Sequence, residues 1–334
     1  MDRLLLSHGG GGEETYKLIN EIILKYFGNP ILNSLEDSGL FEVKSKKLAF
    51  TLDGFTVKPL FFKGGDIGKL AVTGTVNDLL VSGAKPISIT VGFVIEEGFS
   101  LEDFRKILES MKKEVEKNQI FVAGGDTKIV PKGAVDGIFI TTSGIGEVVC
   151  PGLSCSALQE GDLILVSGGI GEHGACIMAE REGIGMEIDL KSDCETLMPL
   201  LMPLFESKLE IHAMRDPTRG GLSATLYEWA YSSKVEILIE EEQIPVKPQV
   251  KAFCEALGFE PYHLACEGRV VICAPEISAH KILELLRSSE SGKDSAIIGK
   301  VLKKSESPKV ILKTLYGVER VLENASGELF PRIC

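Results

Sequence analysis

A glycine-rich turn opens the first long helix that the residue pattern predicts, and it reads Gly64-Gly65-Asp66-Ile67-Gly68-Lys69. The helix itself is predicted from apolar residues that recur at helical spacing and form a stripe for burial: Leu70, Ala71, Gly74 and Leu79. Asn77 and Asp78 interrupt that stripe, and buried polar side chains are costly unless something binds them. The pattern therefore predicts that a ligand or another segment contacts this helix.

Acidic residues also stand at the ends of two predicted strands. Residues 48–52, in which Leu, Phe and Leu alternate, deliver Asp53-Gly54, and residues 120–123 end in Gly124-Gly125-Asp126-Thr127-Lys128. Carboxylate oxygens suit a hard cation, lysines offset phosphate charge, and glycines let the main chain approach a ligand closely. With the two aspartates around the helix, the pattern indicates a magnesium–triphosphate site. Solvated caps at element ends are the alternative that it leaves open.

Length and composition limit the class of protein. The chain has 334 residues, enough for about two domains, and its 44% hydrophobic and 25% charged residues are typical of globular proteins. A net charge of −12 without a basic run argues against nucleic acid or an anionic membrane as partner, and no apolar stretch approaches a membrane span. Eight cysteines without a CxxC pair, and no recognisable export signal, predict reduced thiols and a cytoplasmic location.

The pattern restarts around Cys150-Pro151-Gly152, which predicts a first domain of residues 1–150 and a second of residues 151–322. Residues 323–334 would form a mobile tail, with a small polar joint followed by an apolar, proline-stiffened tip that ends in Cys334. Fully extended, the residues after the joint reach roughly 23 Å, so the thiol could visit a distant pocket. A frayed end with an incidental cysteine is the alternative.

A glycine motif in the second domain offers a rival nucleotide site. Gly169, Gly171 and Gly174 follow the predicted strand 162–167 and match the G-x-G-x-x-G fingerprint of dinucleotide-binding folds. Asp189 comes after them at a shorter interval than that fingerprint expects. A tight turn between a strand and a helix also explains these glycines.

Several segments, taken together, resemble the ATP-binding half of the aminoimidazole-ribonucleotide (AIR) synthetase superfamily: Asp53-Gly54, Gly64 to Lys69, Thr75-Val76-Asn77-Asp78, Gly83-Ala84-Lys85-Pro86 and Gly124 to Lys128. Three more resemble its HypE family of hydrogenase maturation proteins: His8 to Gly11, Asp216 to Gly221 and the terminal Pro331-Arg332-Ile333-Cys334. The resemblance implies a two-domain α/β (α+β) fold. In this fold the N-terminal sheet domain pairs in a homodimer with ATP near the interface, a C-terminal α/β sandwich domain follows, and the tail is flexible.

The resemblance also implies an activity. A carbamoyl group carried on the thiol of Cys334 would be dehydrated with ATP to a thiocyanate, the source of the cyanide ligands of the nickel–iron hydrogenase. The carbamoyltransferase HypF would supply the carbamoyl group, and the HypC–HypD scaffold complex would accept the cyanide. Alternatives are another ATP-dependent enzyme of the superfamily, similar to selenophosphate synthetase or thiamine-phosphate kinase, and an ATP-responsive interaction protein without activity.

The expected site residues follow from these patterns and from the resemblance. Cys334 would carry the substrate, and Lys128 and Glu267 best fit the family's pattern for the base that removes the nitrogen protons. The nucleotide would contact Asp53, Gly64, Gly65, Asp66, Lys69, Asn77, Asp78, Asp126 and Thr127, and Mg2+ would be held by Asp53, Asp78 and Asp126. Arg332 would offset the terminal carboxylate. In the polar turn 215–221, Arg–Asp pairing that pins the loop is expected around Asp216.

Overall fold

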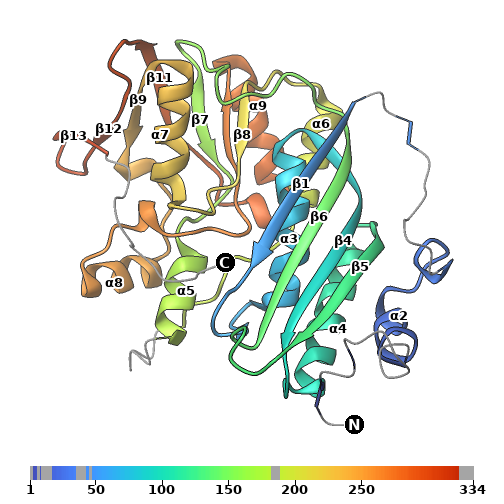
Figure 1. The fold of residues 1–334 in the computed structure, drawn as a ribbon. Helices are drawn as coiled ribbons and strands as arrows, with labels where there is room; N and C mark the ends of the chain where they lie inside the picture. The colour runs from blue at the N-terminus through green and yellow to red at the C-terminus, as the bar shows by residue number, and fades with distance from the viewer. Residues whose placement is uncertain are drawn as a thin grey trace.

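In the computed structural model of the chain, the described residues are 3–5, 8, 17–34, 43–44, 47–181 and 189–322. They form two α/β units that lie side by side (Figure 1). The first contains a four-stranded sheet and the second a seven-stranded sheet, as the expected two-domain α/β fold requires. The tail with Arg332 and Cys334, and the glycine run after His8, lie outside the described residues.

The N-terminal sheet has the strand order β1-β6-β4-β5. Its strands are β1 (Leu48–Phe55), β4 (Ala84–Glu96), β5 (Phe121–Val130) and β6 (Ile138–Val148); the β4–β5 pair is parallel and the other two pairs are antiparallel. One face is covered by α3 (Ile67–Val81) and α4 (Leu101–Lys117), as Figure 1 shows. The hairpin of β2 (Phe61–Phe62) and β3 (Gly65–Asp66) leads into α3, and the short helical segments η2 (Leu18–Ile23), α2 (Leu24–Phe27) and η3 (Leu32–Ser34) precede the sheet.

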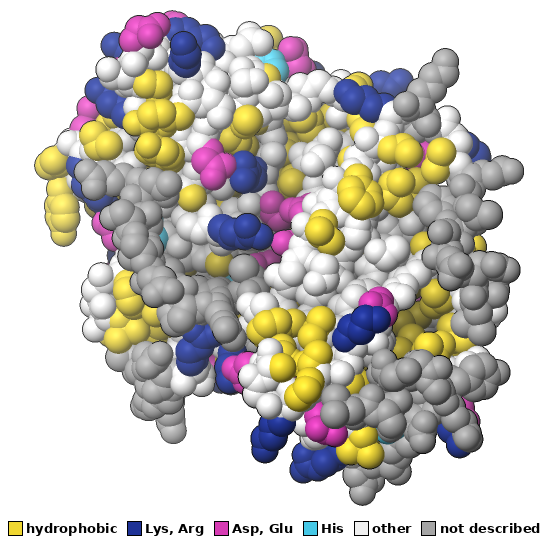
Figure 2. All heavy atoms as spheres, viewed as in Figure 1, with side chains coloured by type: hydrophobic (Ala, Val, Ile, Leu, Met, Phe, Trp, Pro, Cys, Tyr) yellow, Lys and Arg dark blue, Asp and Glu magenta, His cyan; other side chains and the backbone are white. Residues whose placement is uncertain are grey.

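The two faces of this sheet differ in their packing. On β1, Thr51 and Phe55 contact α3, whereas Phe50 and Leu52 on the opposite face are 75% and 65% exposed. Figure 2 shows hydrophobic side chains on this open face. The apolar residues that alternate along this strand therefore lie on its open side. An alternation with a period of two predicts a strand, but it does not tell which side of the strand is buried.

Strand β5 is longer than the sequence pattern predicted. We expected it to end at Ala123, but it continues through the glycine pair to Val130. It stays paired with β4, and a Cβ atom on Gly125 would lie 2.5 Å from the carbonyl oxygen of Val91. These glycines therefore allow close strand pairing, and Asp126 lies within a strand rather than at its end.

The C-terminal sheet has the order β13-β12-β9-β11-β7-β10-β8. Its strands are β7 (Leu163–Val166), β8 (Ala213–Arg215), β9 (Val235–Glu240), β10 (Val271–Ala274), β11 (Ala296–Lys304), β12 (Lys309–Lys313) and β13 (Glu319–Val321). Helix α7 (Gly221–Ser233) packs on one face, and α9 (Glu276–Arg287) with α6 (Met198–Ser207) packs on the other. Helices α5 (Glu172–Arg181) and α8 (Pro248–Leu257) pair with each other.

Helix α3 joins the two units. It contacts its own sheet, and it also contacts α6 and β8 of the second unit. Apolar residues of α3, α4, α6 and α9 belong to one continuous core. The helix is consequently buried almost all round, so its polar residues must find partners within the protein or face a cavity. No helix in the described part of the chain has the length and apolar character that a membrane crossing needs.

Candidate active site

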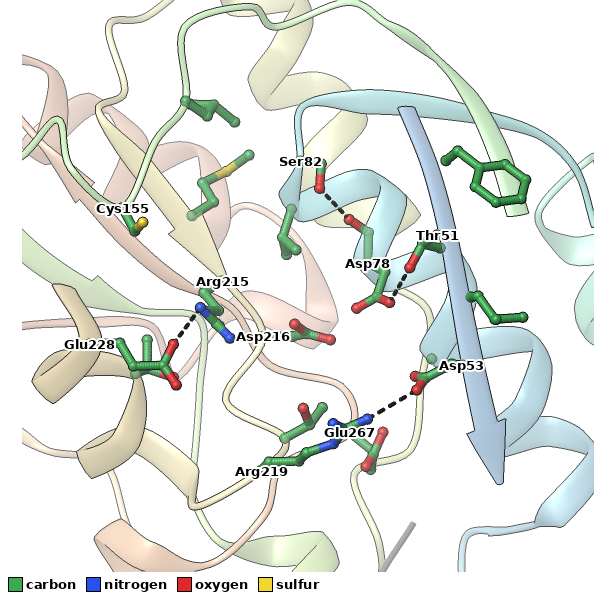
Figure 3. Close-up of a pocket in the computed structure, with 18 of the residues that line it drawn as sticks. Thr51, Asp53, Asp78, Ser82, Cys155, Arg215, Asp216, Arg219, Glu228 and Glu267 are labelled. Carbon is green, nitrogen blue, oxygen red and sulfur yellow. Dashed lines mark hydrogen bonds and ion pairs between the residues drawn. The ribbon is translucent and has the colours of Figure 1, made fainter. Parts of the chain in front are cut away.

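A cavity of about 620 Å³ lies between the two units. One wall comes from β1 and α3, and the other from residues 153–155, the segment 214–219 and helix α7, with Glu267 between them. Figure 2 shows acidic and basic side chains gathered at this hollow, and Figure 3 shows which residues point into it. The volume lies in the range of small-molecule sites, roughly 300–1,000 Å³.

The N-terminal wall carries two carboxyl groups. Asp53 lies on β1 on the side that faces α3, and Asp78 lies in the last turn of that helix. The hydroxyl of Thr51 donates a hydrogen bond of 2.8 Å to Oδ2 of Asp78. Burial raises the pKa of both carboxyl groups; the charge of Asp53 raises the pKa of Asp78 further, and the Arg219 guanidinium opposes the rise at Asp53.

The C-terminal wall adds two more carboxyl groups. Asp216 follows β8 directly, and burial together with the charge of Asp78 raises its pKa to about 7. Glu267, in the connection before β10, is 2% exposed, and its buried Oε1 has no hydrogen-bond partner among the described residues. Burial, and next the charge of Asp216, raises the pKa of Glu267 well above its ordinary value. Four desolvated carboxyl groups therefore face one cavity (Figure 3), an arrangement that favours a bound proton or cation.

The two arginines of the polar turn have partners outside that turn. Nη2 of Arg219 lies 3.2 Å from Oδ1 of Asp53 across the cavity mouth, and Nη1 of Arg215 lies 2.6 Å from Oε2 of Glu228. The expected pairing with Asp216 inside the loop is therefore wrong. Sequence reasoning missed the contact between Arg219 and Asp53 because their strand and loop are 166 positions apart.

The glycine-rich turn before α3 lies away from this cavity. Asp66 caps the helix, accepting hydrogen bonds of 2.7 and 3.1 Å from the amides of Gly68 and Lys69, and Nζ of Lys69 donates to the carbonyl oxygen of Gly64 at 3.2 Å. Asp78 lies twelve positions after Asp66, and a helical rise of 1.5 Å per residue places the two roughly 18 Å apart. The predicted residues Gly64, Gly65, Asp66 and Lys69 thus form a second group, at the opposite end of α3.

The predicted residues of β5 form a third group. Asp53 is aligned across the sheet with Gly125, three strand spacings or roughly 14 Å away. Asp126, the next residue, lines a hollow on the open face, and its Oδ1 lies 2.9 Å from Nζ of Lys128. Within one chain, Asp53 and Asp78 share the cavity with Glu267, whereas Asp126, Thr127 and Lys128 do not line it.

The side chain of Asn77 is used inside the protein. It is 1% exposed, and its Nδ2 donates to the carbonyl oxygens of Glu195 and Glu267 at 3.0 and 3.1 Å. Its Oδ1 accepts a hydrogen bond of 2.8 Å from the amide of Leu197. The polar interruption of α3 is thus explained by the second unit of the chain; Asn77 does not line the cavity, and its expected contact with a nucleotide stays a prediction.

In the turn that matches the dinucleotide fingerprint, other residues of the chain occupy the space beside the glycines. The amide of Gly171 donates to Sγ of Cys266 at 3.1 Å, and that of Gly174 donates to the carbonyl oxygen of Ala265 at 3.0 Å. A Cβ atom on Gly174 would lie 2.9 Å from the amide nitrogen of Ala265. The segment before Glu267 therefore packs where a dinucleotide would need to approach, and these glycines serve chain packing.

The described residues by themselves do not form a complete metal site. Among the described residues, no group of three or more His, Cys, Asp or Glu side chains is arranged to hold a metal ion. The donors at the cavity are nevertheless hard carboxylate oxygens, which suit Mg2+ when phosphate and water complete its coordination.

Comparisons with known proteins cover both halves of the chain. The family model "AIR synthase related protein, N-terminal domain" matches residues 35–148, and "AIR synthase related protein, C-terminal domain" matches residues 159–311. A carbamoyl dehydratase HypE from Azotobacter vinelandii is 43% identical over 329 residues, which cover 98% of this chain and 96% of that protein. A crystal structure of the hydrogenase maturation protein HypE in complex with ATP has a TM-score of 0.95 at 39% identity, over 99% of this chain and 100% of that one. A crystal structure of a HypE–HypF complex has a TM-score of 0.80 at 44% identity, over 92% of this chain and 99% of that one.

Proposed function

The chain belongs to the AIR synthase-related family and, within it, to the HypE carbamoyl dehydratases, and from this premise we propose how its interdomain cavity serves the reaction. The protein is an ATP-dependent carbamoyl dehydratase of hydrogenase maturation. We propose that the carbamoyl group is carried on the thiol of Cys334, which lies outside the described residues. The alternative activities, similar to those of selenophosphate synthetase or thiamine-phosphate kinase, are therefore not needed to explain the chain.

The chemistry defines what the cavity must provide. An amide oxygen is a poor leaving group, so ATP phosphorylates the oxygen of R–S–C(=O)NH2, and a base takes the first nitrogen proton. The products of this step are R–S–C(=NH)–OPO3²⁻ and ADP. The C–O bond then breaks, phosphate leaves with the second nitrogen proton, and R–S–C≡N remains. A base in a site that excludes water is therefore required.

Glu267 is the observation that carries the proposal. Its carboxyl group lines the cavity, is buried, and has one oxygen that no residue in the described part of the chain contacts by a hydrogen bond. Burial raises its pKa, which makes the carboxylate a stronger base than a solvated glutamate. We assign to it the removal of the first nitrogen proton.

The two carboxyl groups of the N-terminal wall fit a magnesium ion that accompanies ATP. Asp53 and Asp78 present hard oxygen donors; burial raises the pKa of both, and the Arg219 guanidinium offsets only part of the rise, so the cavity favours further positive charge. When bound, Mg2+ supplies that charge and neutralises the phosphate oxygens. The chain's own contribution is to hold Asp78 in place through the hydroxyl of Thr51.

The open face of the N-terminal sheet supports a homodimer. Phe50 and Leu52 are largely exposed there, and Asp126 and Lys128 belong to the same face. Large exposed apolar side chains on a sheet face indicate an interface. In a dimer formed through this face, Asp126 and Lys128 would approach the second copy, which is how they could serve the nucleotide despite their distance from Asp53. Thr127, between them, is aligned with the buried Phe93 and lies on the side of the strand that faces α4.

Partners and location complete the proposal. A relative at 44% identity has been solved in a HypE–HypF complex, which supports HypF as the carbamoyl donor of this chain. The HypC–HypD complex remains the proposed acceptor of the cyanide, and the cytoplasm the proposed location.

Replacement of Glu267 by glutamine tests the function directly. The variant should bind ATP with wild-type affinity in calorimetry and should accept a carbamoyl group from the transferase. Intact-mass analysis should then find the carbamoylated protein without the loss of water that ATP causes in the wild type. Dehydration at the wild-type rate would remove Glu267 from the reaction.

A further inference from the structure

The main chain of Glu267 is held from two sides, although its Oε1 has no hydrogen-bond partner within the described ranges. On one side, its carbonyl oxygen accepts the hydrogen bond of 3.1 Å from Nδ2 of Asn77. On the other, Asp193 accepts hydrogen bonds of 3.2 Å from the amides of both Glu267 and Gly268. A Cβ atom on Gly268 would lie 2.0 Å from the carbonyl oxygen of Asp193, so the two segments are in direct contact.

Asp193 belongs to a segment, residues 192–197, that we call the strap. The strap is fastened to the N-terminal unit at several points: the amide of Ser192 donates to the carbonyl oxygen of Lys63 at 2.9 Å, and Lys117 and Glu195 form an ion pair of 2.5 Å. Asn77 adds two hydrogen bonds to the strap, at residues 195 and 197. Helix α3, the strap and the Glu267 connection are therefore linked through one buried amide.

We propose that Asn77 is a positioning residue for the dehydration step, because its amide fixes the main chain of Glu267 against the helix that carries Asp78. Asp78 is the next residue of α3 and lines the same cavity as Glu267. The bond from Asn77 therefore sets the distance between the base and the wall beside which the nucleotide phosphates would lie. This inference rests on the proposed role of Glu267 as the base.

The effect of losing this bond follows from the geometry that proton transfer requires. A base acts within hydrogen-bond reach of its proton, and a misplacement of about 1 Å can cost on the order of 100-fold in rate. Asn77→Ala frees the carbonyl oxygen of Glu267 and loosens the connection without adding charge beside Asp78. We expect the maximal dehydration rate to fall at least about tenfold, while the ATP concentration for half-maximal rate stays nearly unchanged.

The matched control is Thr73→Ala on the same helix. Thr73 is fully buried, and its hydroxyl contacts the strap through Sγ of Cys194 at 3.4 Å; its other hydrogen bonds go to carbonyl oxygens of its own helix, at Lys69 and Leu70. It should lower the thermal stability without a comparable loss of rate. Should Asn77→Ala fail to fold, Asp193→Asn removes part of the anchor from the other side, and the same split between rate and ATP dependence is expected.

The experiment measures single-turnover dehydration of the carbamoylated full-length protein by intact mass, at several ATP concentrations. A rate for Asn77→Ala no lower than that for Thr73→Ala would overturn the inference. A higher ATP concentration for half-maximal rate, with an unchanged maximal rate, would also overturn the inference. It would instead support the nucleotide contact expected from the sequence. The Glu267→Gln variant separates the two proposals: if it reacts like the wild type, the base assignment itself fails, whereas an inactive Glu267→Gln beside a fully active Asn77→Ala refutes the positioning role alone.

Discussion

Replacing Asp216 by asparagine should stabilise the folded protein above neutral pH and leave its stability near pH 4 almost unchanged. The reason is the environment of this carboxyl group. Burial raises the pKa of Asp216 from its ordinary value of 3.8 to about 7, and the charges of Asp78 and Asp53 add to the rise. Asparagine has nearly the same shape but carries no charge at any pH.

The sign and size of the effect follow from this shift. A carboxyl group with a raised pKa in the folded state is protonated in both the folded and the unfolded state below pH 3.8, so it does not lower the free energy of unfolding there. As the pH rises toward 7, the unfolded chain loses the proton first, and the folded state loses stability relative to it. Because a pKa difference of one corresponds to about 1.4 kcal/mol, this shift destabilises the folded wild type by about 4 kcal/mol above pH 7. For a chain of 334 residues, this corresponds to a gain of about 6 °C in Tm for Asp216→Asn.

Thermal melts from pH 4 to pH 9, with a chelator to remove cations, would measure this. The chain has a single tryptophan, Trp229, which is 1% exposed and lines the same cavity, so its fluorescence reports unfolding at the site. The exposed Asp294 supplies the control Asp294→Asn, which should follow the wild type at every pH. A stability difference for Asp216→Asn that does not change with pH would refute the reasoning.

Three further predictions concern the reaction and its ligands. Cys334→Ala should fold and bind ATP, but intact-mass analysis should never find a carbamoyl or cyano group on it; an adduct on another cysteine would contradict the carrier assignment. Asp78→Asn should weaken the binding of ATP measured calorimetrically in the presence of Mg2+ by at least about tenfold, because a charged donor is lost, and wild-type affinity would remove Asp78 from the site. Arg219→Ala should change the free energy of unfolding by less than about 1 kcal/mol, because its ion pair with Asp53 is exposed on the arginine side. It should nevertheless raise the pKa of Asp53, so that Mg2+ binding weakens more at pH 5 than at pH 8; an equal loss at both values would argue against this coupling.

Much of the fold could be predicted from local patterns. The strands and helices follow apolar periodicity, and Ser100 caps α4 by accepting a hydrogen bond from the amide of Asp103. The resemblance to the HypE family, which rested on motif order, is confirmed at 43% identity. The short strands β8 and β13 were missed because three residues are too few to show a period. The end of β5 was misplaced because paired glycines usually mark a turn, whereas here they permit close contact with β4.

The site was harder to predict, because it depends on which segments meet across the two units. Sequence reasoning grouped the aspartates by their motifs, but α3 alone separates Asp66 from Asp78 along its length, and the sheet separates Asp126 from Asp53. Periodicity could not indicate that Asp216 lies opposite Asp78, since β8 and α3 come from different domains. The polar residues of α3 did provide one usable signal: a buried asparagine needs partners, and they came from the second unit at Glu195, Leu197 and Glu267.

The acidic cavity is costly to the fold, and the surrounding contacts explain how the chain tolerates it. Desolvated carboxyl groups repel one another, so the two walls would separate if only Asp53 and Arg219 joined them at the exposed mouth. The joining contacts lie instead behind the cavity, in the apolar core that α3 shares with α6 and α9 and in the buried amide of Asn77, where water does not compete for the hydrogen bonds. Such an arrangement keeps the carboxyl groups close together, where their raised pKa values favour a bound proton or cation. A site with these properties exchanges stability for function: Asp216→Asn, which should stabilise the fold above neutral pH, also removes a charge that raises the pKa of Glu267 and so makes its carboxylate a weaker base.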